Sequence, residues 1–245
     1  MKRVLVTGAS RGIGRAIALK LAEQGWKVAI HGSRPTRELE ITREELQDAY
    51  SGTYVADLAH SASAEAIIDR ALDSGPLQAL VNNAGVYQPL RFLDSSDAEF
   101  ESSFLHTMSV NFETPLRLTR RVCQYFQSQG GGKVLNVASR VGFRGEAGAA
   151  IYSASKAALI NMTRALAVEL APKSIGMFGI APGWVDTAMV RDGMEDRLPS
   201  ILETIPLGRM ASPGDCASAA AYLLSDEAAY LSGVTIDING ASYFH

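Results

Sequence analysis

Cysteine and histidine are scarce in this sequence, and neither residue type is arranged for a disulfide or a metal site. The two cysteines, Cys123 and Cys216, lie far apart and outside any Cys-x-x-Cys pattern, which is typical of a protein from a reducing compartment. The histidines lack the spacing of metal ligands; they are His31, His60, His106 and His245. We therefore expect two buried thiols, no disulfide framework and no metal ion.

Long apolar runs and an excess of positive charge are also missing. No stretch reaches the roughly 18 apolar residues that a membrane-spanning helix requires. The basic pair Lys2 and Arg3 precedes only three apolar residues before Thr7, so this segment predicts a strand instead of a secretory signal, and the protein is expected to be cytoplasmic. With a formal net charge of -3, the chain has no basic excess for a nucleic-acid backbone. Neither nucleic acid nor a membrane is an expected partner.

What the sequence does contain is an alternation of short β-branched runs with longer segments of helical period. The runs predict strands at Arg3–Val6, Lys27–Ile30, Thr53–Ala56, Ala79–Val81, Lys133–Val137, Ser174–Ile180 and Val234–Ile238. The helical segments are Gly12–Gln24, Thr36–Asp48, Ala62–Leu72, Ala98–Ser128, Ile151–Leu170 and Pro213–Leu224. This alternation predicts an α/β Rossmann fold, a doubly wound and mostly parallel sheet of about seven strands with helices on both faces. Because no linker or repeat interrupts the chain, we expect a single domain over residues 1–245.

Two segments depart from this regular pattern. Pro115 lies inside the predicted helix Ala98–Ser128 and should kink or break it. The stretch Ala181–Met210 contains several glycines and prolines and has no regular period. Long irregular segments in α/β domains are usually functional, so residues 183–210 are expected to form a lid that closes over a substrate.

The first predicted strand is followed by a glycine-rich turn, Thr7–Gly14, with the sequence TGASRGIG. In a dinucleotide-binding fold, Gly8 allows the tight turn, Gly12 and Gly14 let the backbone approach a pyrophosphate, and the helix N-terminus offers free N–H groups. A P-loop is disfavoured because no lysine follows Gly14. Two alternatives remain, a plain strand-to-helix turn and the GxSxG elbow of a serine hydrolase around Ser10. The elbow needs an oxyanion loop upstream, and only nine residues precede Ser10.

A second motif pairs Tyr152 with Lys156, four residues apart on the predicted helix Ile151–Leu170. This spacing places both side chains on one face, where the ammonium should lower the pKa of the phenol. Such a phenol can exchange a proton with a carbonyl oxygen or an alcohol. Ser139 follows the strand Lys133–Val137 at the sheet edge where ligands bind, and its hydroxyl can stabilise a developing alkoxide. Because the Tyr-Lys spacing arises by chance on many helices, it gains weight only together with Ser139 and the glycine turn.

These motifs together resemble the short-chain dehydrogenase/reductase family, in its branch of subunits about as long as this chain. The matching positions run along the whole sequence: Thr7–Gly14, Asp57, Leu58, Asn82, Asn83, Ala84, Gly85, Asn111, Ser139, Tyr152, Lys156, Pro182, Gly183 and Thr187. The resemblance implies catalysis by Asn111, Ser139, Tyr152 and Lys156. It also implies a homotetramer built from Ala98–Ser128, the catalytic helix and the C-terminal segment.

The same resemblance implies contacts with a nicotinamide cofactor. Asp57 is implied to contact the adenine, and the segment Asn83–Gly85 the adenosine half. Asn111 is implied to hold a water that relays protons through Lys156, which also binds the nicotinamide ribose. The carboxamide is implied to meet two residues, Val185 and Thr187.

Residues after the second predicted strand indicate which cofactor is bound. Folds that prefer NAD place an Asp or Glu there to hold the ribose hydroxyls, whereas this chain reads His31-Gly32-Ser33-Arg34. Without that carboxylate, Arg11, Ser33 and Arg34 can bind a 2′-phosphate, which favours NADP(H); the alternative is that both arginines lie in solvent. The expected cofactor-binding residues are Gly8, Ser10, Arg11, Gly12, Ile13, Gly14, Ser33, Arg34, Asp57, Leu58, Asn83, Ala84, Gly85, Tyr152, Lys156, Pro182, Gly183, Val185 and Thr187.

The substrate is less sharply indicated. The chain looks most like the reductases of 3-oxoacyl chains on acyl carrier protein, which dock that carrier on two basic positions. Here Gly130–Gly132 occupies the first position and Lys173 the second, so carrier docking stays open. An acyl chain or a small keto compound with a carboxylate would suit the residues expected around the carbonyl: Ser139, Arg140, Val141, Phe143, Arg144, Tyr152, Trp184 and Met189.

The leading hypothesis is an NADPH-dependent carbonyl reductase or alcohol dehydrogenase, whose substrates include 3-oxoacyl thioesters. The alternative is a non-catalytic NADP(H)-binding regulatory module. Such a module would not need Asn111, Ser139, Tyr152 and Lys156 together.

Overall fold

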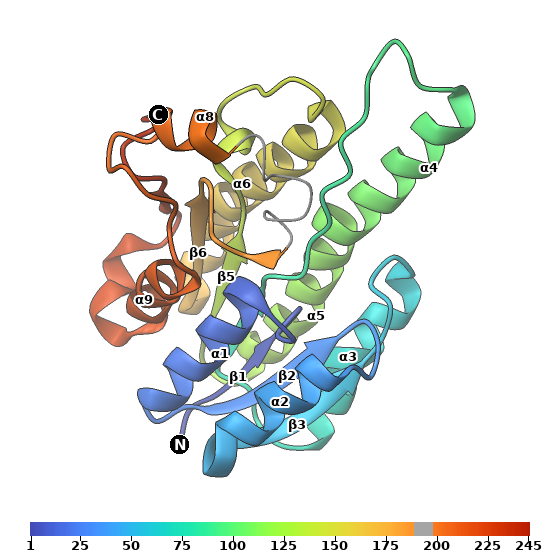
Figure 1. Ribbon diagram of the computed structural model, residues 1–245. Coiled ribbons are helices and arrows are strands. Elements are labelled where there is room, and N and C mark those ends of the chain that lie inside the picture. Colours follow the sequence, from blue (N-terminus) through green and yellow to red (C-terminus); the bar gives the residue numbers. More distant parts are fainter. Residues whose placement is uncertain (189–197) are drawn as a thin grey trace.

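The computed structural model describes residues 1–188 and 198–245. Within them, one sheet of seven strands has the order β3-β2-β1-β4-β5-β6-β7 (Figure 1), and all neighbouring strands are parallel. The strands are β1 (Arg3–Val6), β2 (Lys27–Gly32), β3 (Tyr50–Val55), β4 (Ala79–Asn82), β5 (Gly132–Val137), β6 (Ile175–Pro182) and β7 (Thr235–Ile238). The predicted doubly wound α/β sheet is confirmed, and its strand order reverses between β1 and β4.

Helices cover both faces of this sheet (Figure 1). They are α1 (Gly12–Glu23), α2 (Arg37–Leu46), α3 (Ser61–Asp73), α4 (Asp97–Met108), α5 (Thr114–Ser128), α6 (Ala150–Leu170), α8 (Leu198–Glu203) and α9 (Pro213–Leu224). Short 3-10 turns lie at Gln47–Ala49, Arg140–Gly142, Ala171–Lys173 and Asp226–Leu231. Along β1, Val4 and Val6 belong to a core with α1 and α9, whereas Leu5 belongs to a core with α3 and α5. The apolar strands are therefore buried on both faces, as a parallel sheet requires.

The long helix expected over Ala98–Ser128 is interrupted near Pro115, as predicted. A π-helical turn over Ser109–Glu113 separates α4 from α5. In a regular α-helix the ring of Pro115 would clash with the carbonyl oxygen of Asn111, and the wider π-helical turn relieves that contact. The break therefore falls at one of the predicted site residues.

The stretch expected to be irregular, Ala181–Met210, is regular in part. β6 extends to Pro182, and α8 covers Leu198–Glu203. The lid predicted over 183–210 includes residues outside the described ranges, so it stays a prediction. Among the described helices, none combines the length and apolarity needed to cross a bilayer.

The two cysteines are core residues, as expected. Cys123 and Cys216 are buried free thiols. Burial raises the pKa of each thiol to about 12. Both side chains are therefore unreactive packing groups.

Candidate active site

The glycine turn brings the ends of β1 and β4 into close backbone contact. Gly8 has a φ of 63°, and a Cβ added there would lie 2.8 Å from the Cα of Ala84. A Cβ on Gly14 would lie only 2.2 Å from the carbonyl oxygen of Gly8. The amide of Asn83 donates to the carbonyl oxygens of Thr7 at 2.9 Å and Gly8 at 3.0 Å. Glycine is thus required at these positions, and Asn83 holds the turn in place.

His31, for which the sequence predicted no role, also holds this turn. Its side chain is buried. Nδ1 accepts the Gly8 N–H at 3.3 Å, so Nε2 carries the proton and donates to the carbonyl oxygen of Ala56 at 2.9 Å. Burial lowers the pKa of His31, which favours this neutral form. The imidazole therefore ties the ends of β2 and β3 to the glycine turn.

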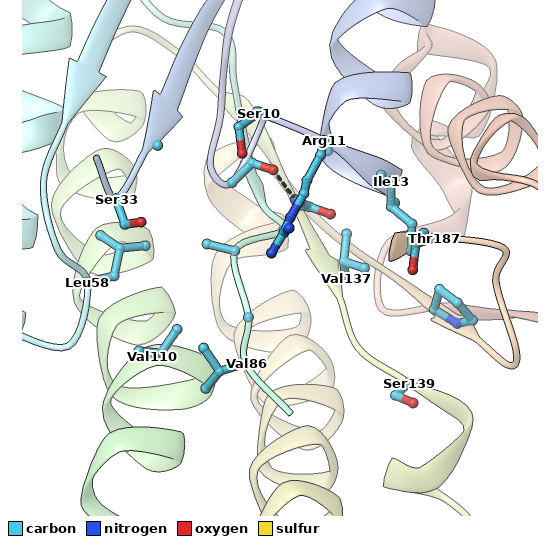
Figure 2. A pocket seen from close by; sticks show the side chains of 18 of the residues that line it. Ser10, Arg11, Ile13, Ser33, Leu58, Val86, Val110, Val137, Ser139 and Thr187 are labelled. Carbon is cyan, nitrogen blue, oxygen red and sulfur yellow. Dashed lines mark hydrogen bonds between the residues drawn. The ribbon is translucent and has the colours of Figure 1, made fainter. Parts of the chain in front are cut away.

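A cleft of about 560 Å³ opens beside the carboxyl ends of the strands, where open α/β sheets bind their ligands. Every residue predicted to bind cofactor lines it: Gly8, Ser10, Arg11, Gly12, Ile13, Gly14, Ser33, Arg34, Asp57, Leu58, Asn83, Ala84, Gly85, Tyr152, Lys156, Pro182, Gly183, Val185 and Thr187. Lining residues that were not predicted are His31, Gly32, Val86, His106, Val110, Val137, Ala138 and Ala188. Figure 2 shows Ser33 and Leu58 at one side, Ser139 and Thr187 at the other, and the Arg11 side chain extending between them.

One corner of the cleft, beyond the end of β2, is cationic. Arg11, Ser33 and Arg34 line it, and Asp57 is the only acidic residue among the described residues of the lining. The Asp57 carboxylate accepts the N–H of Ala59 at 2.9 Å. This corner therefore offers two guanidinium groups and a hydroxyl to an anion.

A carboxylate outside the lining competes for one of these guanidinium groups. Glu38 lies in the first turn of α2. Its own backbone N–H, the Thr36 hydroxyl and the charge of Arg11 lower the pKa of Glu38. An anion bound at Arg11 would therefore share that charge with Glu38.

At the other side of the cleft, α6 presents Tyr152 and Lys156 close to Ser139. Lys156 is buried. Its Nζ donates to the carbonyl oxygen of Val137 at 2.9 Å and lies 5.7 Å from the centre of the Tyr152 ring. The spacing of four residues thus places both side chains on the cleft side of their helix.

The acidity of this pair differs from the prediction. Burial raises the pKa of Tyr152 to about 12; a hydrogen bond from Ser139 opposes the shift, and the charges of Tyr87 and Glu146 add to it. Burial also lowers the pKa of Lys156 to about 8. The predicted lowering of the phenol pKa is wrong in these surroundings, because desolvation of the buried phenol is the largest cause of the shift. At neutral pH Tyr152 is therefore a protonated phenol beside a largely charged lysine.

Asn111 stands behind the cleft and does not line it. Its amide accepts the Val86 N–H at 2.9 Å and donates to the Val86 carbonyl oxygen at 2.9 Å. It also donates to the Ser155 hydroxyl at 3.2 Å, which in turn donates to the backbone oxygen of Tyr152 at 2.7 Å. Asn111 therefore links the strand-end segment after β4 to the helix that carries Tyr152.

Most residues predicted around the carbonyl are not part of the lining of the cleft. Ser139 and Tyr152 line it, whereas five others do not: Arg140, Val141, Phe143, Arg144 and Trp184. Met189 lies outside the described residues. Arg140 and Val141 are buried, and Arg144 is exposed. A neighbour of Tyr152 that the sequence did not reveal is Tyr87, whose ring meets the Tyr152 ring edge-on with centroids 5.0 Å apart; its position just after Gly85 and Val86 was the available signal.

The described residues also show whether the ligand groups that metal ions require are present. Within those ranges, no three His, Cys, Asp or Glu side chains are grouped so that they could hold a metal ion. The polar groups of the cleft are mainly hydroxyl, amide, guanidinium and ammonium groups, with one carboxylate, that of Asp57, and the imidazoles of His31 and His106.

Comparison with known proteins gives consistent matches. The family model for short chain dehydrogenase matches residues 2–198. The 3-oxoacyl-[acyl-carrier-protein] reductase of Escherichia coli (strain K12) is 34% identical over 243 residues, which are 99% of this chain and 97% of that protein.

Two solved structures share the fold over nearly their whole length. The 3-ketoacyl-(acyl-carrier-protein) reductase from Brucella melitensis, complexed with NADH, has a TM-score of 0.88 and 31% identity, covering 99% of this chain and 98% of that one. A Beutenbergia cavernae protein with NADP at low occupancy, assigned as an NAD(P) dependent gluconate 5-dehydrogenase, has a TM-score of 0.90 and 31% identity, covering 98% and 96%. The matched length and the identity establish that this chain belongs to the short-chain dehydrogenase family of oxidoreductases.

Proposed function

We propose that this protein is an NADPH-dependent carbonyl reductase that also runs in reverse as an alcohol dehydrogenase. The observation that carries the proposal is the convergence of Ser139, Tyr152 and Lys156 at one side of a cleft whose other side is the glycine turn. This arrangement supports a bound dinucleotide with its reactive ring next to a proton donor. Gly8, Gly12 and Gly14 support the same fit. Gly8 and Gly12 have a left-handed backbone, and Gly14 has no room for a Cβ.

The side chains of this chain supply the proton and hold the reacting oxygen. When bound, the nicotinamide supplies the hydride. Tyr152, protonated at neutral pH because its pKa is about 12, donates to the carbonyl oxygen as a general acid. The charge of Lys156 stabilises the phenolate that results. When substrate is bound, the Ser139 hydroxyl turns from Tyr152 and donates its hydrogen bond to the same oxygen, and a preorganised donor of this kind contributes about 3 kcal/mol.

The preference for NADPH rests on the cationic corner. Arg11, Ser33 and Arg34 line the cleft where a ribose 2′-phosphate would lie. Arginine binds phosphate through charge-assisted hydrogen bonds. Folds that prefer NAD place an Asp or Glu after the second strand, where this chain has Ser33 and Arg34.

For the substrate we propose a 3-oxoacyl thioester or a small oxo compound. Similarity to 3-oxoacyl-[acyl-carrier-protein] reductases supports the thioester. Docking of a carrier protein has less support: Gly131 packs where a Cβ would lie 2.5 Å from the carbonyl oxygen of Ser174, so a basic side chain cannot occupy this position. Lys173 remains as a basic residue, bonded to Gln127.

The test is an activity panel with matched variants. The purified protein is mixed with NADPH or NADH and with acetoacetyl-coenzyme A, a short aldehyde, a simple ketone or a keto acid, and the loss of nicotinamide absorbance is followed. We expect NADPH-dependent turnover of at least one compound. Tyr152→Phe should lower kcat by about 10²–10⁴-fold with NADPH binding retained, while Tyr230→Phe, at a fully exposed tyrosine, should behave as wild type.

The same panel separates the proposal from the regulatory-module alternative. A protein that binds NADPH tightly but turns over no compound would favour the module. Full activity of Tyr152→Phe would refute the proposed chemistry. Several-fold faster turnover with NADH would overturn the cofactor preference.

The protein is further expected to assemble as a homotetramer. Large apolar side chains are exposed on neighbouring helices, with Phe104 and Leu105 on α4, Leu116 on α5 and Val168 on α6. Large apolar side chains exposed on neighbouring helices are what a protein interface would cover. Light scattering that reports a stable monomer would refute this assembly.

A further inference from the structure

The loop that follows the catalytic serine is bound by a distant part of the chain. This loop, residues 139–146, is called the serine loop, and the segment Asn239–His245 is called the tail segment. The Arg140 guanidinium donates to the Ser242 hydroxyl at 3.0 Å. The Phe143 ring stacks on His245 with centroids 3.7 Å apart. These two contacts join residues about a hundred positions apart. None of the four residues lies in a β-strand or an α-helix.

The opposite side of the serine loop rests directly on the catalytic helix. A Cβ on Gly142 would lie 2.6 Å from Ile160 Cδ1 and 2.9 Å from the backbone carbon of Lys156. The loop backbone is therefore in contact with α6 one turn beyond Tyr152. With the tail segment on one side and α6 on the other, the loop has little freedom to move.

Arg140 is an unusual residue to bury beside an active site. It is only 5% exposed, and its Nε has no hydrogen-bond partner among the described residues. Its ion pair with Glu146 is long, 3.5 Å, and its guanidinium carbon lies 5.9 Å from the centre of the Trp184 ring. A buried charge with such incomplete pairing is weak evidence for a role in stability. Its location next to Ser139 suggests a different use.

The tail segment is itself held in a bent conformation. Gly240 and Ala241 both have a left-handed backbone, with φ of 61° and 66°, and this conformation is unfavourable for alanine. The Asn239 amide donates to the carbonyl oxygen of Tyr243 at 2.9 Å, and His245 Nδ1 lies 3.0 Å from Asp237 Oδ2. These contacts fold the tail segment back, so that Ser242 is presented to Arg140.

We infer that Arg140 is a positioning residue: by tying the serine loop to Ser242 in the tail segment, it holds the Ser139 hydroxyl against Tyr152. The inference rests on the proposed function, because it assigns Ser139 and Tyr152 their roles in turnover. Arg140 does not line the cleft. Its role is therefore to hold the serine loop and not to contact the substrate.

The positioning role predicts a change in pH dependence as well as in rate. The Ser139 hydrogen bond lowers the pKa of Tyr152, whereas Tyr87 and Glu146 raise it, and the Lys156 ammonium lies on the same side of the helix. If the serine loop shifts, the Ser139 bond is lost and the phenol becomes less acidic. The pH at which NADP-dependent alcohol oxidation sets in, which requires the phenolate, should then move upward.

Two variants separate position from charge. Arg140→Met breaks the link to the tail segment but also leaves the Glu146 carboxylate unpaired, which alone would raise the pKa of Tyr152. Ser242→Ala breaks the same link without changing any charge. We expect both variants to lower kcat by about tenfold or more, since displacements of about 1 Å can cost 10²-fold, with the KM for NADPH within about twofold of wild type.

Both variants should also shift the oxidation profile to higher pH, and Arg140→Lys should recover part of the rate. The matched control is Phe244→Ala, because Phe244 belongs to the tail segment but is exposed; it should leave rate and profile unchanged. A shift in Arg140→Met without one in Ser242→Ala would mean a purely electrostatic effect and would overturn the inference. An unshifted profile in both variants would do the same.

A structural readout keeps this test separate from that of the proposed function. If Tyr152→Phe is fully active, the proposed function fails, whatever the Arg140 variants do. Crystal structures of wild type and Ser242→Ala then give the distance between Ser139 Oγ and the Tyr152 phenol oxygen. A longer distance in the variant supports the positioning role, and an unchanged distance overturns it.

Discussion

The two sides of the cleft are held by different kinds of contact. At the nucleotide side, formed by the glycine turn and the ends of β2 and β4, tight backbone packing leaves no room for a Cβ, which on Gly14 would lie 2.2 Å from the Gly8 oxygen, and the Asn83 and His31 side chains bond to that same backbone. At the serine side, formed by the serine loop, side chains from distant parts of the chain make the contacts, as between Arg140 and Ser242. Where backbone segments pack this closely, as at Gly8 and Gly14, no residue with a Cβ fits without displacing the backbone. At the serine side, the position of Ser139 depends on side-chain contacts, so substitutions at several residues can change it.

The largest expected effect on cofactor binding is at the nucleotide side. Gly14→Ala forces the turn apart, because the new methyl group overlaps the Gly8 carbonyl oxygen. Overpacking of this kind costs about 1–3 kcal/mol, and we expect NADPH binding, measured by fluorescence titration, to fall by up to about 150-fold. Gly214→Ala is the control, since its nearest neighbour, Ser212 Oγ, would lie at 3.5 Å. Normal NADPH binding by Gly14→Ala would show that the turn is not rigid.

The next effect isolates the serine side. Ser139→Ala should lower kcat by about 10²–10³-fold, because a preorganised donor to the reacting oxygen is lost, while the Kd for NADPH stays unchanged. Steady-state kinetics and NADPH titration measure the two quantities. Ser128→Ala, at an exposed serine on α5, serves as the control. A loss of NADPH affinity equal to the loss in kcat would show that the two sides are not separable.

A smaller effect tests the cationic corner. Arg34→Ala should raise the KM for NADPH about tenfold, because a charged hydrogen bond to phosphate is worth about 1.5–3 kcal/mol, and should leave the KM for NADH unchanged. Glu38→Gln should act in the opposite direction by about twofold, since it frees Arg11. The control is Arg37→Ala, whose guanidinium pairs with Glu44 at 2.9 Å. Equal effects of Arg34→Ala on both cofactors would place the 2′-phosphate elsewhere.

The smallest effect is on stability at acidic pH. Because the pKa of His31 is lowered from 6.5 in the folded protein, the unfolded chain binds more protons between the two values. The His31 contribution to stability is therefore complete above pH 6.5 and decreases as the pH falls from there through the folded pKa. Thermal melting should show it as a drop of about 2–4 °C per kcal/mol. In His31→Gln the drop should be shallower; an equal slope would show that the Gly8 contact does not depend on the neutral imidazole.

Much of the nucleotide side could be predicted because the patterns that specify it lie in short continuous stretches of sequence. The glycine spacing in Thr7–Gly14 and the alternation of strands and helices are local, and the predicted cofactor residues all line one cleft; their contact with a nucleotide stays a prediction. His31 was missed because its hydrogen bonds join three strand ends that the sequence keeps apart.

The serine side could be predicted only in part. Ser139, Tyr152 and Lys156 meet in the cleft because strand ends and helix periodicity are readable from sequence. Arg140, Phe143 and Trp184 are adjacent in sequence to site residues, which suggested contact with substrate. Their side chains contact Ser242, His245 and each other, which proximity along the chain does not determine, and their contact with substrate stays a prediction.

By itself, the amino-acid sequence determined the layered α/β architecture, the break at Pro115 and the identity of the residues that meet at the strand ends, because these follow from periodicity, backbone sterics and the edge at which parallel strands end. Only the tertiary structure decided the protonation of Tyr152, the role of His31 and the burial of Arg140. Those properties depend on how much solvent is excluded and on which distant groups are brought within hydrogen-bond distance. Both are consequences of packing that no local pattern encodes.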